Sequence, residues 1–193
     1  MHPKREKMFA AAIVKFSKKG TSATTMQEIA EEAGIGKGTL YRYFKNKEDL
    51  ISSLIKFGLN DVLEKVKKEI AKLDDPIKKI EQIITVQLNF YKNHGEFHKF
   101  LTREVWGHKL KFKYEIKEIM DKYTEIIENV IIEGIEQKKL KKMNPLNVTI
   151  SLFGMIYITS AHRIMFEQDF SANEIEEIKE DIMEIYFNGI TID

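Results

Sequence analysis

Residues 25–44 restrict the possible folds of this chain more than any other segment. Thr25 and, three residues later, Glu28 have the spacing of a capping box, which predicts that a helix begins here. Gly34 and Gly36 then interrupt the helical pattern, and a second short helix is expected over about 37–44. Helices of about two turns are unstable alone, so both must pack against neighbouring helices. Two short helices joined by a tight turn form the unit that places a helix in the major groove of DNA.

The remaining segments also have helical periodicity, and runs with the alternating pattern of β-strands are scarce. We therefore expect an all-α fold with nine helices, over approximate ranges 3–19, 25–33, 37–44, 46–73, 75–93, 96–106, 111–138, 145–166 and 172–188. The fourth helix would be about 40 Å long, which is enough to join two domains, and Gly58 is a candidate weak point within it. Gly20 is expected to end the first helix in a left-handed conformation.

The composition limits the classes of protein to which the chain can belong. Apolar residues make up 43% of the 193 residues, enough for a buried core, and cysteine is absent, which excludes disulfides and thiol chemistry. The N-terminus lacks the apolar run of a signal peptide, and the uncharged stretch 144–162 holds too many polar residues for a membrane span. A cytoplasmic protein without a membrane segment is therefore expected.

The charges are unevenly distributed along the chain. Residues 1–50 carry ten Lys/Arg and six Asp/Glu, whereas the rest of the chain carries 21 Lys/Arg and 24 Asp/Glu. A basic end on a chain with a net charge of only +1 indicates that a polyanion binds at that end.

The segment that carries these signals is residues 24–50, which read Thr-Thr-Met-Gln-Glu-Ile-Ala-Glu-Glu-Ala-Gly-Ile-Gly-Lys-Gly-Thr-Leu-Tyr-Arg-Tyr-Phe-Lys-Asn-Lys-Glu-Asp-Leu. In this register, the segment resembles the tetracycline-repressor (TetR) family of bacterial transcriptional regulators. The resemblance implies a nine-helix fold with an N-terminal three-helix helix-turn-helix domain, residues 1–46, that binds DNA. It also implies a C-terminal helical domain, residues 47–193, that binds a ligand and forms a dimer, and it implies no cofactor.

The resemblance further indicates which residues contact DNA. The family's phosphate-binding threonine matches Thr25, and the lysine at the start of the fourth helix matches Lys47, whose backbone N–H lies at a positive helix terminus. The matching recognition-helix positions are Lys37, Gly38, Thr39, Tyr41 and Tyr43. The family often has serine where this chain has Gly36. Glycine has no hydroxyl group, so a hydroxyl–phosphate contact at this position is in doubt.

Side-chain chemistry adds a second expectation for this surface. Phosphate contacts should dominate affinity, and base choice should come from Lys37, Thr39 and Arg42, because lysine or arginine on guanine is the commonest specific pairing. The alternative for Tyr41 and Tyr43 is packing against a neighbouring helix. The alternative for the lysines, including Lys47, is a solvated position on the surface.

The last two helices are predicted to form a homodimer interface, over about 145–166 and 172–188. The first of them is apolar on nearly every side, which does not fit a surface helix of a monomer. The second has isoleucines in a stripe at spacings of three and four, namely Ile175, Ile178, Ile182 and Ile185. In the family, the last two helices of each subunit pair as a four-helix bundle. The alternative for the second helix is burial within its own subunit.

Aromatic residues are dense between residues 90 and 157, and a cavity lined by aromatic side chains is suited to a small hydrophobic effector. The candidate effector contacts are Phe90, Phe97, Trp106, Tyr123 and Phe153, with Tyr157 as a polar group. The alternative for each is an ordinary core position. An acyl-CoA effector would need basic groups at the mouth of the site, and Lys109, Lys111 and Lys113 could supply them.

Other chemistry has little support in the sequence. His94 and His98 are four residues apart, but Gly95 between them and the lack of further ligands argue against a metal site. No catalytic set, phosphate loop or zinc motif is found, so an enzyme is not expected. The resemblance to the TetR family implies a dimeric repressor that binds palindromic operator DNA and is released by a small apolar effector through movement of the fourth helix. The alternative is a DNA-binding regulator without a small-molecule effector, or one controlled by a protein partner.

Overall fold

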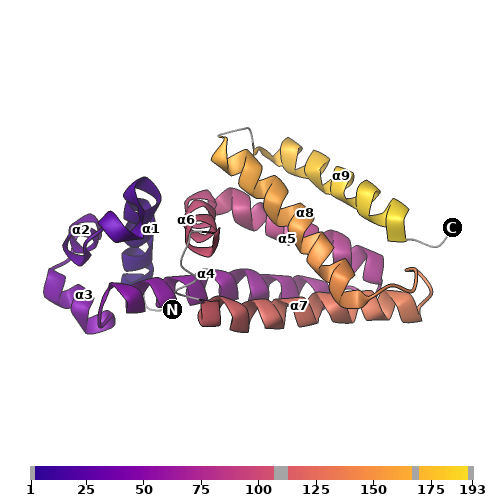
Figure 1. Ribbon diagram of the computed structural model, residues 1–193, viewed down its shortest axis with the longest axis horizontal. Coiled ribbons are helices and arrows are strands. Elements are labelled where there is room, and N and C mark those ends of the chain that lie inside the picture. Colours follow the sequence, from indigo (N-terminus) through magenta and orange to yellow (C-terminus); the bar gives the residue numbers. More distant parts are fainter. Residues whose placement is uncertain (1–2, 107–112, 167–169, 191–193) are drawn as a thin grey trace. The chain divides into compact units, whose positions relative to one another are not determined.

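The computed structural model describes residues 3–106, 113–166 and 170–190, and every regular element in these ranges is a helix (Figure 1). The nine helices of the described residues are α1 (Pro3–Ala23), α2 (Met26–Glu32), α3 (Lys37–Tyr43), α4 (Lys47–Ile70), α5 (Pro76–Asn93), α6 (Gly95–Trp106), α7 (Lys113–Glu136), α8 (Pro145–Met165) and α9 (Ala172–Ile190). The predicted all-α fold is confirmed.

Local capping chemistry sets where the helices begin. Thr25 and Glu28 form the predicted capping box at α2. The Asn46 side chain accepts a 2.8 Å hydrogen bond from the backbone N–H of Asp49 at the start of α4. Asp75 accepts from the backbone of Ile77 at 2.8 Å. Each cap satisfies a backbone donor that the first helical turn leaves without a partner.

Glycines in the left-handed region of φ end the first two helices. Gly20 has φ of 78° and ψ of 164°, so the regular part of α1 stops there as predicted, and residues 21–23 form a separate short turn. Gly34 has φ of 63° and ends the α2 segment. An L side chain is disfavoured at both positions, whereas glycine adopts this conformation readily.

The described residues fall into two compact units. The N-terminal unit comprises Met1–Leu59 and Gly95–Ile116. In it α1 packs against α2 and α6, and α2 packs against α3. Its core contains Phe9, Phe16, Leu40, Phe44 and Phe100, each at most 2% exposed. Leu40 and Phe44 therefore face inward as expected from the sequence, which leaves the opposite side of α3 for solvent.

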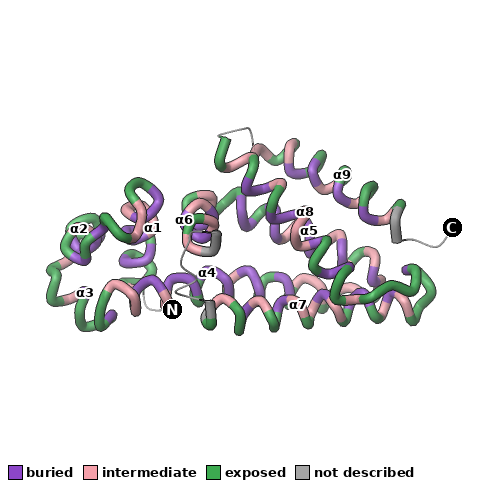
Figure 2. The backbone as a smooth tube through the Cα atoms, in the orientation of Figure 1, coloured by how far each residue is buried: buried purple, intermediate pink, exposed green. Residues whose placement is uncertain are grey.

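The C-terminal unit comprises Asn60–His94 and Lys117–Asp193. Here α5 packs against both α8 and α9, and α8 also contacts α9. Buried residues recur on one side of each helix (Figure 2). Fully buried members of this core are Ile80, Ile84, Leu88, Ile127, Leu152 and Ile156. The core is thus made by apolar stripes from helices that lie far apart in the sequence.

Helix α4 contributes residues to both units, since the division falls between Leu59 and Asn60. The helix is unbroken at Gly58, the candidate weak point. Gly58 instead allows a close approach. A methyl group at this position would lie 2.3 Å from Cζ of Phe97, a buried residue of α6. The helix ends at Ile70 rather than Leu73, and a turn in which the N–H of Leu73 donates to the carbonyl of Ile70 follows it.

Candidate DNA-binding surface and effector site

Helix α3 presents a polar and aromatic surface to solvent. Lys37, Gly38 and Arg42 are exposed, and Thr39 is half-buried. Tyr41 and Tyr43 are 45% and 36% exposed. The Nζ of Lys37 lies 6.0 Å from the ring centroid of Tyr41. All six residues predicted on this helix are therefore accessible to a ligand, while Leu40 anchors the helix from below.

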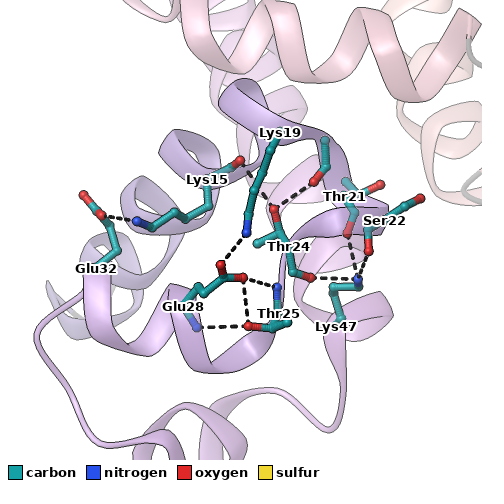
Figure 3. A network of polar contacts seen from close by, with 10 residues as sticks. Lys15, Lys19, Thr21, Ser22, Thr24, Thr25, Glu28, Glu32 and Lys47 are labelled. Carbon is teal, nitrogen blue, oxygen red and sulfur yellow. Dashed lines mark hydrogen bonds and ion pairs between the residues drawn. The ribbon is translucent and has the colours of Figure 1, made fainter.

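The N-terminus of α2 is fixed by charged and hydroxyl groups (Figure 3). The hydroxyl of Thr25 donates to Oε2 of Glu28 at 2.9 Å, and the backbone N–H of Thr25 donates to the same oxygen at 2.8 Å. Lys19 forms an ion pair with Glu28. Hydrogen bonds from Lys19 and then from Thr25 lower the pKa of Glu28 to about 2. The carboxylate stays ionised, so the cap holds at neutral pH.

Lys47 has a role that the sequence did not reveal. Its Nζ donates to the backbone carbonyls of Thr21 at 2.7 Å, Thr24 at 2.8 Å and Ser22 at 3.3 Å (Figure 3). Residues 20–24 follow the regular part of α1, which stops at the kink at Gly20, and lead to α2; we call them the connector. Carbonyls at a helix end commonly lack backbone partners. The Thr21 carbonyl also accepts a 3.4 Å hydrogen bond from the backbone N–H of Thr24, and one ammonium group binds all three carbonyls. The first residue of α4 is thereby tied directly to the connector.

Helix α6 holds the same region from another side. The hydroxyl of Thr21 donates to Oε1 of Glu104 at 2.9 Å, and Nη1 of Arg103 donates to the carbonyl of Ser17 at 2.7 Å. The rings of Phe16 and Phe100 stack with centroids 5.5 Å apart. Within the N-terminal unit, the helix-turn-helix is therefore positioned by contacts from both α4 and α6.

The predicted effector contacts do not form one group. Tyr123, Phe153 and Tyr157 lie together, with ring centroids 6.4 Å apart for Tyr123 and Phe153 and 5.6 Å apart for Phe153 and Tyr157. Tyr91, which was not among the candidate contacts, joins them at 6.1 Å from Tyr157. Gln87 reaches the group through a hydrogen bond from its amide to the hydroxyl of Tyr123. We call these five residues the Gln87 cluster, and all belong to the C-terminal unit.

The other candidates lie elsewhere. Phe90 is buried in the C-terminal unit beside His94, at a ring-centroid distance of 4.7 Å. Phe97 belongs to the N-terminal unit, where it packs on Gly58. Trp106 is the last residue of α6, and its side chain is outside the part that the structure describes. The same holds for the side chain of Lys113, and Lys109 and Lys111 are outside the described residues altogether.

The Gln87 cluster is uncharged, and all of its residues are buried except Phe153, which is half-buried. Gln87 is 2% exposed, Tyr123 4%, Tyr157 6% and Tyr91 8%. Burial raises the pKa of Tyr91 and of Tyr123 well above the usual range for a phenol. The hydroxyl groups therefore remain protonated at neutral pH and act as neutral hydrogen-bonding groups.

An apolar stripe is exposed on one side of α8. It consists of large side chains at helical intervals of four, eight and seven residues, namely Leu146, Ile150, Ile158 and Met165, each between 42% and 60% exposed. Gly154 continues the same spacing, and the space over it is open. Helix α9 differs from the expectation, because Ile175, Ile178 and Ile182 are buried within the C-terminal unit and Ile185 alone of the four isoleucines is exposed. The α9 stripe therefore stabilises its own subunit.

Two further findings concern membranes and metals. By length and composition, α8 is the one helix of the described residues that could cross a membrane, a test that core helices of soluble proteins also pass. Over residues 3–106, 113–166 and 170–190, no group of three or more His, Cys, Asp and Glu side chains is placed to hold a metal ion. His98 is 1% exposed, and burial lowers its pKa to about 4.

Comparison with known proteins assigns the chain to a family. Residues 9–54 match the family described as bacterial regulatory proteins, tetR family. Residues 56–188 match the C-terminal region of YsiA-like proteins, which covers more than half of the chain. The chain belongs to the TetR family of transcriptional regulators, as its helix-turn-helix indicated.

Several relatives of the chain are described as regulators of fatty acid metabolism. The chain is 25% identical over 191 residues to the fatty acid metabolism regulator protein of Bacillus subtilis (strain 168), covering 97% of this chain and 96% of the relative. Its fold is similar to the crystal structure of the regulator FadR from Bacillus subtilis in complex with stearoyl-CoA, with a TM-score of 0.86 and 23% sequence identity. The match covers 95% of this chain and 98% of the FadR chain. The structure of a Clostridium perfringens protein described as a fatty acid metabolism regulator matches with a TM-score of 0.80 and 29% sequence identity. This match covers 97% of this chain and 100% of the Clostridium perfringens chain. These relatives are regulators rather than enzymes.

Proposed function

We propose that this TetR-family regulator is a dimeric repressor of the bacterial cytoplasm that binds palindromic operator DNA and is released by an apolar acyl effector. The observation that carries the DNA-binding part is the accessible surface of α3 on a helix-turn-helix held by the α2 capping box and by its core. A short helix anchored by Leu40 and exposing Lys37, Thr39 and Arg42 has the form required of a recognition helix.

The contacts to DNA divide into two kinds. Lys37, Thr39 and Arg42 are placed on α3 to reach base edges, whereas Tyr41 and Tyr43 are suited to phosphates beside the groove. Thr25 and Lys47 stand at the starts of α2 and α4, where backbone N–H groups attract a phosphate. Gly38 lets the α3 backbone approach the DNA closely, since the space over it is open. Because the Lys47 ammonium already binds carbonyls, its phosphate contact would use the backbone N–H.

A dimer would carry two helix-turn-helix units and so bind two half-sites. The exposed stripe of α8 supports the proposed interface, because a row of isoleucine, leucine and methionine side chains gains free energy when a second copy covers it. A two-fold axis then places two α3 helices on half-sites about one DNA turn apart, or a multiple of it. In this proposal α8 provides most of the apolar contact, and α9 adds Ile185.

The effector is proposed from the relatives and from the Gln87 cluster together. A similar fold binds stearoyl-CoA in the Bacillus subtilis FadR crystal structure. In this chain the aromatic, uncharged Gln87 cluster suits an apolar acyl group.

Helix α4 is the proposed link, because it contributes to both units and Lys47 at its start holds the connector. A shift of α4 would pull on the carbonyls of Thr21 and Thr24 and so reposition the helix-turn-helix. DNA and effector would then oppose each other's binding.

The test is an anisotropy titration of fluorescent operator DNA with the purified protein, in the presence and absence of stearoyl-CoA. Free CoA is the matched control. Coupling between two sites is typically 5–150-fold, so stearoyl-CoA should raise the Kd for DNA within that range, whereas CoA should leave it unchanged. Unaltered DNA affinity at saturating stearoyl-CoA would reject the acyl effector and leave a DNA-binding regulator controlled in another way.

A further inference from the structure

One polar group in the interior of the C-terminal unit is incompletely satisfied. Gln87 lies on α5 between fully buried apolar neighbours, among them Ile83, Ile84 and Leu88. Its amide donates to the hydroxyl of Tyr123, and its Oε1 is buried with no hydrogen-bond partner among the described residues. Exchanging the amide oxygen and nitrogen would not remove this problem, because Tyr123 would then bind the oxygen and leave the NH₂ group unsatisfied.

An amide of this kind is costly in a core. A buried donor or acceptor without a partner retains most of its desolvation penalty, whereas an apolar side chain of the same size would avoid it. An apolar residue would suit this position, because Gln87 lies on the buried stripe of α5 that is otherwise formed by Ile80, Ile84 and Leu88. A polar group held at such a position points to a ligand that completes its hydrogen bonds.

The surroundings restrict the charge of that ligand group. The polar members of the Gln87 cluster are one amide and the three hydroxyls of Tyr91, Tyr123 and Tyr157. None of these groups carries a charge at neutral pH. A carboxylate placed among them would lose its hydration without gaining a cation, which is strongly unfavourable. The group that Gln87 recognises is therefore neutral.

From this geometry we infer that Gln87 is a specificity-determining residue that selects effectors whose apolar acyl chain carries a hydroxyl group. A hydroxyl both donates and accepts, so it satisfies the free end of the amide in either orientation. The rings of Phe153 and Tyr157, which stack on each other in the same cluster, offer apolar surface for the chain around it. The inference rests on the proposed acyl effector and adds the chemical class that this chain prefers.

The test compares stearoyl-CoA with a set of hydroxystearoyl-CoA isomers that differ in the position of the hydroxyl. Kd values are measured by calorimetry on the full-length protein. At least one isomer should bind roughly tenfold tighter than stearoyl-CoA, the value of one buried hydrogen bond. The variant Gln87→Met keeps the length of the side chain and removes both polar ends, so the effector hydroxyl would lose its partner and the preference for that isomer over stearoyl-CoA should be lost or reversed. Gln87→Leu is the second variant if Gln87→Met does not fold.

The matched control is Gln82→Met, because Gln82 lies on the same helix, is only half-buried and is not part of the cluster. This variant should keep the preference of the unmodified protein. Equal affinity of the unmodified protein for all isomers and stearoyl-CoA would overturn the inference, and so would a preference that survives in Gln87→Met. In both cases stearoyl-CoA would still bind, so the proposed acyl effector would stand. Failure of every acyl-CoA to bind would overturn the inference and the acyl effector together.

Discussion

Replacement of Lys47 by methionine separates two roles for this residue. Methionine keeps an unbranched apolar stem but removes the ammonium group that binds three carbonyls of the connector. Hydrogen bonds to a charged group contribute about 1.5–3 kcal/mol. Two of the three are short, at 2.7 and 2.8 Å, but the site is half-exposed and water can replace part of the loss. We therefore expect Lys47→Met to lower the free energy of unfolding by about 1–2 kcal/mol, which lowers Tm by roughly 2–8 °C.

The assay combines thermal unfolding without DNA and a salt series of DNA binding. If the ammonium only holds the connector, Lys47→Met lowers Tm and weakens DNA binding by a similar factor at every salt concentration. If it binds a phosphate, Tm is unchanged and the slope of log K against log salt falls in magnitude by about 0.9. Lys45→Met is the control for stability, since Lys45 is exposed just before α4 and its loss should change Tm little. An unchanged Tm together with a reduced slope would refute the structural role assigned to Lys47.

Three further predictions follow from the packing, a buried histidine and the exposed stripe of α8. Gly58→Ala should lower stability by about 1–2 kcal/mol despite its gain in helix propensity, because the new methyl group would lie 2.3 Å from the Phe97 ring; adding Phe97→Leu should cost less than the sum of the two single changes in urea denaturation. The pKa of His98 is about 4 in the folded state and 6.5 in the unfolded state, so its contribution to the free energy of unfolding is complete above pH 6.5 and is lost as the pH falls through 4. His98→Leu should remove up to about 3 kcal/mol of this pH dependence. Identical curves of unfolding free energy against pH for the variant and the unmodified protein would contradict the assignment. Ile150→Glu should give a folded monomer in sedimentation analysis, whereas Ile132→Glu, at an exposed isoleucine of α7, should stay dimeric; a dimeric Ile150→Glu would place the interface elsewhere.

The sequence predicted those parts of the structure that local chemistry controls. The caps at Thr25, Asn46 and Asp75 depend on residues within a few positions of each other, so the helix starts could be read directly. The turn glycines and the inward positions Leu40 and Phe44 were equally local. These signals were sufficient for the fold class and for the helix-turn-helix.

The misplaced features depend on contacts between distant segments. Gly58 was expected to weaken α4, but its lack of a side chain is used by Phe97, which lies 39 positions further along the chain. The density of aromatic residues did not show that Phe97 and Tyr123 belong to different compact units. The carbonyls that bind the Lys47 side chain lie more than 20 residues away, so no local pattern could reveal them. One missed residue did leave a signal: Gln87 is a polar residue on the apolar stripe of α5.

Selection from a random DNA library by the purified protein tests most directly whether the protein binds palindromic DNA as a dimer. The enriched sequences should contain two half-sites related by a two-fold axis and spaced by one DNA turn or a multiple of it. Arg42→Ala, at an exposed position of α3, should relax the sequence preference within each half-site. Enrichment of a single unrepeated site, or no enrichment over the starting library, would contradict the binding of palindromic DNA by a dimer.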